Sequence, residues 1–283
     1  MSDDLRGKVF LVTGATEGIG KAATVAFVRR GADVTIVGRN KEKTERVLEE
    51  LRALGGAGKL ALLLGDLSKI ADVRAVAVAF RENHDRLDVL VNNAGAVFTT
   101  RQLSADGWEM TFALNHLAYF VLTVELEELL KKTPGARVVS TSSEAHRGGR
   151  LRDLDEVAKR TSGKAGFGAY SDSKLANILF TRELARRLGP SVYVSCFHPG
   201  FVRSGFGHNN GSGWSMVIGA ASSLFGRTPE KGAETLIWLA TSQDALSANG
   251  EYWKDMKVAK STKYAKDDAL AKRLWDFSAK ITS

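Results

Sequence analysis

Short apolar runs alternate with longer mixed stretches along the first two hundred residues of the chain. Runs such as 8–12 and 87–91 are apolar at nearly every position, which is typical of strands covered on both faces. Between them, stretches such as 19–30 place apolar residues three and four positions apart, the spacing of an amphipathic helix. The alternation therefore predicts a parallel sheet with helices packed on both faces.

The pattern repeats without a break that would divide the chain. The expected strands are 8–12, 34–37, 60–64, 87–91, 137–142 and 192–197, and the expected helices are 19–30, 41–54, 70–82, 110–130 and 170–188. No internal repeat and no Pro-rich or Gly/Ser-rich linker interrupts this order. We therefore expect one α/β domain over residues 1–283, a Rossmann-type doubly wound parallel sheet.

Two segments depart from this rhythm. Residues 144–169 are rich in glycine and charge, and residues 203–228 combine six glycines with apolar side chains such as Trp214 and Phe225. A long glycine-rich insert of this kind predicts a substrate lid that closes over an apolar molecule. A loose loop and a shallow membrane contact are the alternatives.

A glycine-rich turn joins the first expected strand to the first expected helix. Residues 13–20 read Thr-Gly-Ala-Thr-Glu-Gly-Ile-Gly, and the turn opens directly into the helix. Glycines let a backbone approach a pyrophosphate closely, and a helix N-terminus attracts its charge. A tight packing turn is the alternative, but the position between strand and helix favours a dinucleotide site.

The end of the second expected strand bears on the choice of dinucleotide. NAD-binding chains usually place an acidic residue there to hold the ribose, whereas a 2′-phosphate calls for arginine. This chain has Arg39 at that place, with Lys41 and Lys43 close by. NADP(H) is therefore expected, with NAD(H) as the alternative because Glu17 would oppose a 2′-phosphate.

Composition and charge narrow the class of protein. The formal charge is +8, but the basic residues are spread over helical stretches, and no nucleic-acid-binding signature is present, so we expect no nucleic-acid partner. The single cysteine, Cys196, suits a reducing compartment. We find no secretory signal, no apolar run long enough for a membrane span and no metal-ligand spacing, so the expected location is cytoplasmic and no metal site is expected.

A tyrosine and a lysine lie one helical turn apart in the helix expected at 170–188. Tyr170 and Lys174 are four positions apart, so their side chains share a face. An adjacent ammonium lowers the pKa of a phenol, which lets tyrosine give and take a proton near neutral pH. Ser142 ends the fifth expected strand and Ser143 follows it, and either could assist from position alone.

Together these motifs resemble the short-chain dehydrogenase/reductase family over almost the whole chain. The matching elements, in family order, are the turn at 13–20, Asn92-Asn93-Ala94-Gly95, Ser143, the Tyr170/Lys174 pair and His198-Pro199-Gly200. Residues 170–180 (YSDSKLANILF) are similar to the branch that contains the retinol dehydrogenases. The resemblance implies an oxidoreductase that interconverts an apolar alcohol and its carbonyl with a nicotinamide dinucleotide.

The resemblance also implies roles for individual residues. Tyr170 would be the general acid/base, Lys174 would assist it and hold the ribose, Ser143 would bind the substrate oxygen, and Asn115 would steady a water in the proton relay. The implied cofactor contacts are Gly14, Thr16, Gly18, Ile19, Gly20, Arg39, Asp66, Leu67, Asn92, Gly95, Tyr170, Lys174, Pro199, Gly200 and Val202. The resemblance implies Ser143 rather than Ser142, because the family's catalytic serine stands second in such a Ser-Ser pair.

The expected partner is an apolar small-molecule alcohol, aldehyde or ketone. Two other functions compete with this one: a double-bond reductase of the same fold, and a non-catalytic dinucleotide sensor that reports redox state. Relatives in the family often dimerise through the two helices that carry Asn115 and Tyr170, so the resemblance implies a homodimer as one assembly. Patterning alone does not distinguish a buried helix from an interface.

Overall fold

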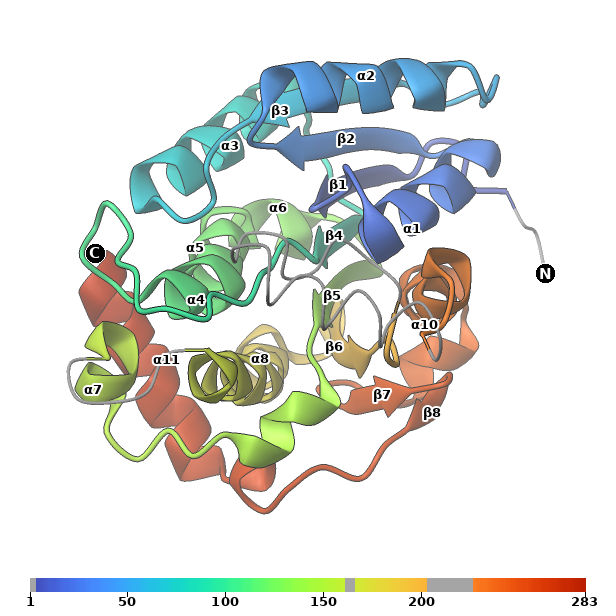
Figure 1. Ribbon diagram of the computed structural model, residues 1–283. Helices are drawn as coiled ribbons and strands as arrows, with labels where there is room; N and C mark the ends of the chain where they lie inside the picture. Colours follow the sequence, from blue (N-terminus) through green and yellow to red (C-terminus); the bar gives the residue numbers. More distant parts are fainter. Residues whose placement is uncertain (1–3, 161–165, 203–225) are drawn as a thin grey trace.

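The computed structural model describes residues 4–160, 166–202 and 226–283, which form one central sheet covered by helices (Figure 1). Its strand order is β3-β2-β1-β4-β5-β6-β7-β8, and every neighbouring pair is parallel except β7 and β8. The strands are β1 (Val9–Thr13), β2 (Asp33–Gly38), β3 (Leu60–Leu64), β4 (Val89–Asn92), β5 (Ala136–Thr141), β6 (Val192–His198), β7 (Tyr252–Lys254) and β8 (Lys257–Val258).

The helices of the described residues flank this sheet. They are α1 (Gly18–Arg29), α2 (Lys41–Arg52), α3 (Ile70–Asn83), α4 (Met110–Phe112), α5 (Ala118–Glu125), α6 (Glu127–Lys132), α7 (Leu154–Lys159), α8 (Phe167–Leu188), α10 (Pro229–Thr241) and α11 (Asp268–Thr282), with a π-helical turn, η1 (Ala113–Leu117), between α4 and α5. Short 3₁₀ turns lie at η2 (Glu144–Gly148), η3 (Gly189–Ser191), η4 (Asp244–Ser247) and η5 (Tyr264–Lys266).

Alternate side chains of each strand enter cores on opposite faces of the sheet. In β1, Val9 and Leu11 pack with α3, α5, α6 and α8, whereas Phe10 and Val12 pack with α1, α2 and α10. This is why the central strands are apolar at every position rather than at every second one. The expected doubly wound α/β class is confirmed.

The strand order reverses between β1 and β4. The chain builds outward from β1 through β2 to β3, then crosses back and continues through β4, β5 and β6 on the other side. In an open α/β sheet, ligands bind outside the carboxyl ends of the strands at such a reversal. The fold therefore places a binding site above the ends of β1 and β4.

Some expected elements are interrupted and others were not foreseen. The helix expected at 110–130 is broken by η1 and again at Leu126, where α5 ends before α6 begins. The sequence patterns did not identify α7, α10, α11 or the β7–β8 pair. Residues 203–225 of the expected lid lie outside the described residues.

The C-terminal helix α11 lies against α5 and α8. Trp275 stacks on Phe180 with ring centroids 5.9 Å apart and meets Phe120 edge-on at 5.0 Å. The guanidinium of Arg187 lies 4.4 Å from the centre of the Trp275 ring on another side. Helix α11 therefore occupies part of the surface through which the resemblance implied a homodimer, and that assembly stays a prediction.

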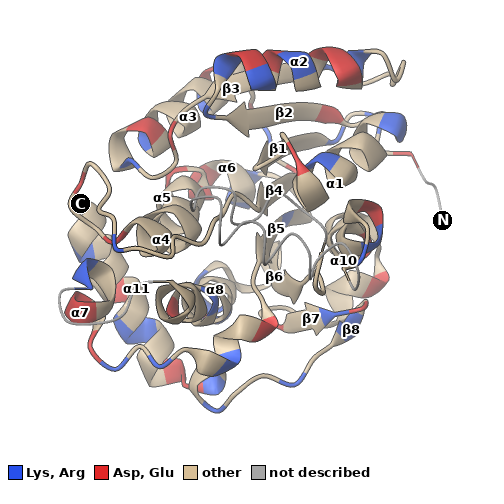
Figure 2. Ribbon diagram, viewed as in Figure 1, with Lys and Arg blue, Asp and Glu red and all other residues tan. Residues whose placement is uncertain are grey.

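Charged residues are spread over the outer elements (Figure 2). Basic residues (lysine and arginine) alternate with glutamates along α2, while β1, β4 and β6 carry no lysine, arginine, aspartate or glutamate. Within the part of the chain that the structure describes, no helix combines the length and the apolar character that crossing a membrane requires.

Replacing Trp275 by alanine should destabilise the fold without touching the cavity. The large ring is buried to 9% exposure, so its removal leaves a void between α5, α8 and α11. We expect the free energy of unfolding to fall by about 3–5 kcal/mol in urea denaturation. Lys272→Ala, on the exposed side of α11, is the control and should change it by less than about 0.5 kcal/mol. Equal values for the two variants would contradict the packing described.

Candidate active site

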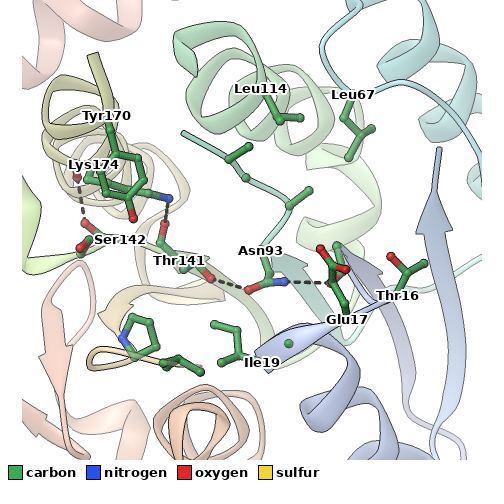
Figure 3. Close-up of a pocket in the computed structure, with 18 of the residues that line it drawn as sticks. Thr16, Glu17, Ile19, Leu67, Asn93, Leu114, Thr141, Ser142, Tyr170 and Lys174 are labelled. Carbon is green, nitrogen blue, oxygen red and sulfur yellow. Dashed lines mark hydrogen bonds between the residues drawn. The ribbon is translucent and has the colours of Figure 1, made fainter. Parts of the chain in front are cut away.

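A cavity of about 830 Å³ lies at the carboxyl ends of the strands (Figure 3). Its walls come from the β1–α1 turn, the residues after β2, β3, β4, β5 and β6, and the first turns of α8. These are the places where the strand order predicts a ligand. A single hollow thus joins the glycine-rich turn to Tyr170 and Lys174.

The glycine-rich turn packs tightly against the segment after β4. Gly14 has a φ of +65°, and a Cβ there would lie 2.8 Å from the Cα of Ala94; a Cβ on Gly20 would lie 2.2 Å from the carbonyl oxygen of Gly14. Glu17 precedes α1 without capping it, and the first turn holds no acidic residue. The helix therefore presents uncapped N–H groups at the cavity, which suits an anionic diphosphate.

Asn93 ties three strand ends together. Its Nδ2 donates to the carbonyls of Thr13 and Gly14 at 3.3 and 3.2 Å, and its Oδ1 accepts from the Thr141 hydroxyl at 3.1 Å (Figure 3). Asn93 lines the cavity, whereas Asn92 is fully buried and donates to Thr123 Oγ1 at 3.0 Å. Asn92 therefore lies behind the cavity, because strand alternation turns its side chain into the core, and the residue at the cavity wall is its neighbour Asn93.

Tyr170 and Lys174 lie on the cavity-facing side of α8, as the i, i+4 spacing predicted (Figure 3). Lys174 Nζ donates to the Thr141 carbonyl at 3.0 Å and lies 5.4 Å from the centre of the Tyr170 ring. Only 2% of Lys174 and 9% of Tyr170 is exposed. The sheet edge thus anchors the ammonium beside the phenol.

The two serines after β5 have different partners. Ser142 Oγ donates to the carbonyl of Lys174 at 2.8 Å, so this hydroxyl fastens α8 to the strand end. Ser143 hydrogen-bonds the Tyr170 side chain, and its Oγ also accepts from the N–H of Ala145 at 3.2 Å. The structure therefore places Ser143 at the phenol, as expected from the Ser-Ser order.

Burial shifts the pKa of both groups on α8. It raises the pKa of Tyr170 to about 12, against the opposing hydrogen bond from Ser143. It lowers the pKa of Lys174 to about 7. The sequence led us to expect that the ammonium would lower the pKa of Tyr170, but in the structure burial is the larger influence. Tyr170 is consequently a neutral phenol at neutral pH.

Asn115 lies behind the cavity wall rather than on it. Its side chain is fully buried in η1, where Oδ1 accepts from the N–H of Ala96 at 2.9 Å. Its Nδ2 donates to the carbonyl of Ala96 at 2.9 Å and to Ser173 Oγ at 3.1 Å. Asn115 therefore fixes the backbone beside Gly95, and π-helical turns of this kind are frequent at functional sites.

The end of the cavity near β2 is basic. Arg39 and Lys43 both line it, and Lys43 Nζ pairs with Glu17 Oε2 at 2.6 Å. We expected the Glu17 carboxylate to oppose a 2′-phosphate, but in the structure it is paired with Lys43. No local sequence pattern predicted this contact. Asp66 accepts hydrogen bonds from the N–H and the hydroxyl of Ser68, beside Leu67.

Aromatic side chains surround the other end. Phe98, Phe167 and Phe201 line the cavity, and more than half of Phe167 and of Phe201 is exposed. Sequence reasoning did not identify these residues, because isolated aromatics carry no spacing signal. The expected residues that line the cavity are Gly14, Thr16, Gly18, Ile19, Arg39, Asp66, Leu67, Gly95, Ser143, Tyr170, Lys174, Pro199, Gly200 and Val202; Gly20, Asn92 and Asn115 lie behind it.

These features define a class of site. An uncapped helix N-terminus at a glycine-rich turn, a basic pocket beyond β2 and a phenol–ammonium pair share one cavity of a doubly wound sheet. The residues present fit a nicotinamide dinucleotide, with the close approach at Gly14 leaving the backbone accessible to a diphosphate. Among the described residues, no group of three His, Cys, Asp or Glu side chains could hold a metal ion.

Known proteins agree with this class. A family model for short chain dehydrogenases matches residues 8–153. Retinol dehydrogenase 14 of Mus musculus is 38% identical, covering 97% of this chain and 85% of that protein, and retinol dehydrogenase 11 of Homo sapiens is 38% identical, covering 98% and 86%. A short chain dehydrogenase from Burkholderia cenocepacia J2315, solved in complex with NADP, is 27% identical with a TM-score of 0.69, covering 88% of this chain and 96% of that one.

The chain is an oxidoreductase that acts on CH–OH and C=O groups. It belongs to the short-chain dehydrogenase family and is retinol dehydrogenase-like within it.

Gly20→Ala should weaken dinucleotide binding. The added Cβ would meet the Gly14 carbonyl and Asn93 Nδ2, so the turn and the segment after β4 must move apart. We expect the NADPH dissociation constant, measured by calorimetry, to rise at least about tenfold. Lys21→Ala is the control on the same helix, since it removes only the half-exposed pair with Glu50. Unchanged affinity in Gly20→Ala would mean that the turn does not hold the cofactor.

Proposed function

We propose that the chain interconverts an apolar alcohol and its carbonyl with NADP(H), using Tyr170 as general acid/base. The observation that carries this proposal is the cluster of Ser143, Tyr170 and Lys174 in the cavity that also holds the glycine-rich turn. The proposal assigns Asn115 a supporting place behind these groups.

In carbonyl reduction, the Tyr170 hydroxyl gives its proton to the carbonyl oxygen while Ser143 holds that oxygen by a hydrogen bond. A nicotinamide dinucleotide held along the glycine-rich turn would supply the hydride for reduction and accept it in oxidation. The neutral phenol that burial favours suits reduction at neutral pH. The Lys174 ammonium, 5.4 Å from the centre of the Tyr170 ring, stabilises the phenolate left behind. The phenolate regains its proton from solvent water before the next turnover.

The basic pocket beyond β2 supports NADP(H) as the cofactor. Arg39 can form paired, charge-assisted bonds to a 2′-phosphate, and Lys43 adds a second cation. The solved Burkholderia relative binds NADP, which is consistent with this choice.

The aromatic end supports an apolar substrate. Phe98, Phe167 and Phe201 offer ring surface in the cavity that Tyr170 also lines, and the ring centroids of Phe167 and Tyr170 are 5.8 Å apart. The relatives named retinol dehydrogenases make all-trans-retinal a reasonable first probe, beside aromatic aldehydes and cyclic ketones.

A non-catalytic redox sensor is the competing function. A sensor needs the dinucleotide turn but has no need of a buried lysine beside a phenol, which costs desolvation. Retention of Ser143, Tyr170 and Lys174 together therefore favours catalysis. A double-bond reductase of the same fold is distinguished by its product, since it would leave the carbonyl intact.

Tyr170→Phe tests the acid/base role. The substitution removes the proton and retains the ring, so we expect kcat for aldehyde reduction to fall at least about 100-fold. The NADPH dissociation constant should stay within about threefold. Both quantities follow from NADPH absorbance and fluorescence. An active Tyr170→Phe protein would refute this mechanism.

Arg39→Ala and Glu17→Gln test cofactor choice in opposite directions. Loss of Arg39 should weaken NADPH binding about tenfold and leave NADH nearly unchanged, since a charge-assisted bond is lost. Glu17→Gln removes the carboxylate and releases Lys43, so NADPH binding should tighten severalfold. Dissociation constants for both cofactors measure this. A constant NADPH/NADH ratio across both variants would place the discriminating contact elsewhere.

A further inference from the structure

A buried chain of polar side chains connects the C-terminal helix to the active-site lysine. His116 in η1 lies between Ser278 of α11 and Asn177 of α8, with Nε2 3.1 Å from Ser278 Oγ and Nδ1 3.3 Å from Asn177 Oδ1. Each of the three residues is at most 1% exposed. Polar groups this deeply buried cost free energy unless their hydrogen bonds are made, so the arrangement calls for an explanation.

The direction of these hydrogen bonds follows from Asn177. Its Nδ2 donates to the carbonyl oxygens of Asn115 and Thr141, at 2.9 and 3.2 Å, so its Oδ1 must face His116. His116 therefore carries its proton on Nδ1, and Nε2 accepts from the Ser278 hydroxyl. Burial lowers the pKa of His116 to about 4, which keeps the ring in this neutral form.

The Thr141 carbonyl is where this chain meets Lys174. That oxygen accepts from Lys174 Nζ at 3.0 Å as well as from Asn177 Nδ2. An ammonium has three N–H donors. Within the described residues, Lys174 Nζ makes one hydrogen bond, to the Thr141 carbonyl that it shares with Asn177, while Asn177 also engages the Asn115 carbonyl. Two N–H groups of Lys174 thus remain for the cavity.

We propose that Asn177, oriented by His116 and Ser278, is a positioning residue that keeps Lys174 on a single shared carbonyl and directs its other N–H groups into the cavity. The proposal rests on the function proposed above for Lys174. Asn177 itself does not line the cavity, so it acts through Thr141 and not on substrate or cofactor.

Removal of the Asn177 donor should change the titration of Lys174. With Thr141 serving Lys174 alone, the ammonium would bind this carbonyl more strongly, which favours the charged form. The titratable groups that face the ammonium are the phenols of Tyr170 on its own helix and of Tyr119 on α5, with ring centres 5.4 and 6.0 Å away. Both are retained in the variants below.

The experiment compares Asn177→Leu with Thr181→Val in the full chain. Thr181 lies one turn further along α8, is fully buried, and donates to the Asn177 carbonyl at 2.8 Å, so its loss costs a buried hydrogen bond without touching Thr141. The Lys174 side chain is titrated by NMR on ¹³C-lysine-labelled protein, assigned with Lys174→Arg. We expect its pKa to rise by at least about half a unit in Asn177→Leu and to stay within about 0.2 in Thr181→Val.

His116 supplies a second test with its own rescue. His116→Leu removes the donor to Asn177 Oδ1 and should shift the Lys174 titration in the same direction, whereas His116→Asn, whose amide can replace Nδ1–H, should restore it. When the protein reduces an aldehyde, the pH dependence of kcat should shift in the same direction as the pKa of Lys174, and KM should change little. A Lys174 titration that is equal in wild type, Asn177→Leu and Thr181→Val would overturn the inference.

The two proposals fail in distinguishable ways. If wild-type protein reduces no carbonyl but Asn177→Leu still shifts the Lys174 titration, the proposed function fails and the positioning role stands. If wild type is active and the titration does not move, only the positioning role is lost.

Discussion

The hydrogen bond from Lys174 to the carbonyl of Thr141 joins α8, the longest helix among the described residues, to the end of a central strand. Around it, Ser142 holds the backbone of α8 and Asn93 holds the Thr141 hydroxyl, so the glycine-rich turn and α8 share one anchor. Burial of an ammonium costs free energy unless its N–H groups have hydrogen-bond partners. The geometry of the cavity therefore depends on the end of β5, where the Thr141 carbonyl accepts the hydrogen bond from Lys174.

Burial gives this anchor its chemical character. Burial lowers the pKa of Lys174, so its ammonium gives up a proton more easily, and it raises the pKa of Tyr170, so the phenol stays neutral. Sequence spacing placed both groups correctly but suggested the opposite direction for the phenol. The difference arises because spacing reports proximity, while the pKa also depends on how much water the folded chain excludes.

Strand and helix patterns predicted the sheet as far as β6, since two-sided burial produces apolar runs that local sequence reveals. They failed for α11, whose apolar side chains make sense only against Phe120 and Phe180, residues about a hundred or more positions earlier. The cavity residues near glycine motifs could be predicted. After β4, the residue that lines the cavity is Asn93 and not the expected Asn92. The Glu17–Lys43 pair and the His116–Asn177 contact could not be predicted, because both depend on tertiary packing that no local pattern encodes.

Hydride transfer is tested most directly by isotope transfer from NADPH dideuterated at the nicotinamide C4. An apolar aldehyde is incubated with the protein, and the product is analysed by mass spectrometry and proton NMR. If the protein transfers hydride to the carbonyl, the product alcohol carries one deuterium on its carbinol carbon. Tight NADPH binding with no deuterium in any product from an aldehyde and ketone panel would contradict it and favour a dinucleotide sensor.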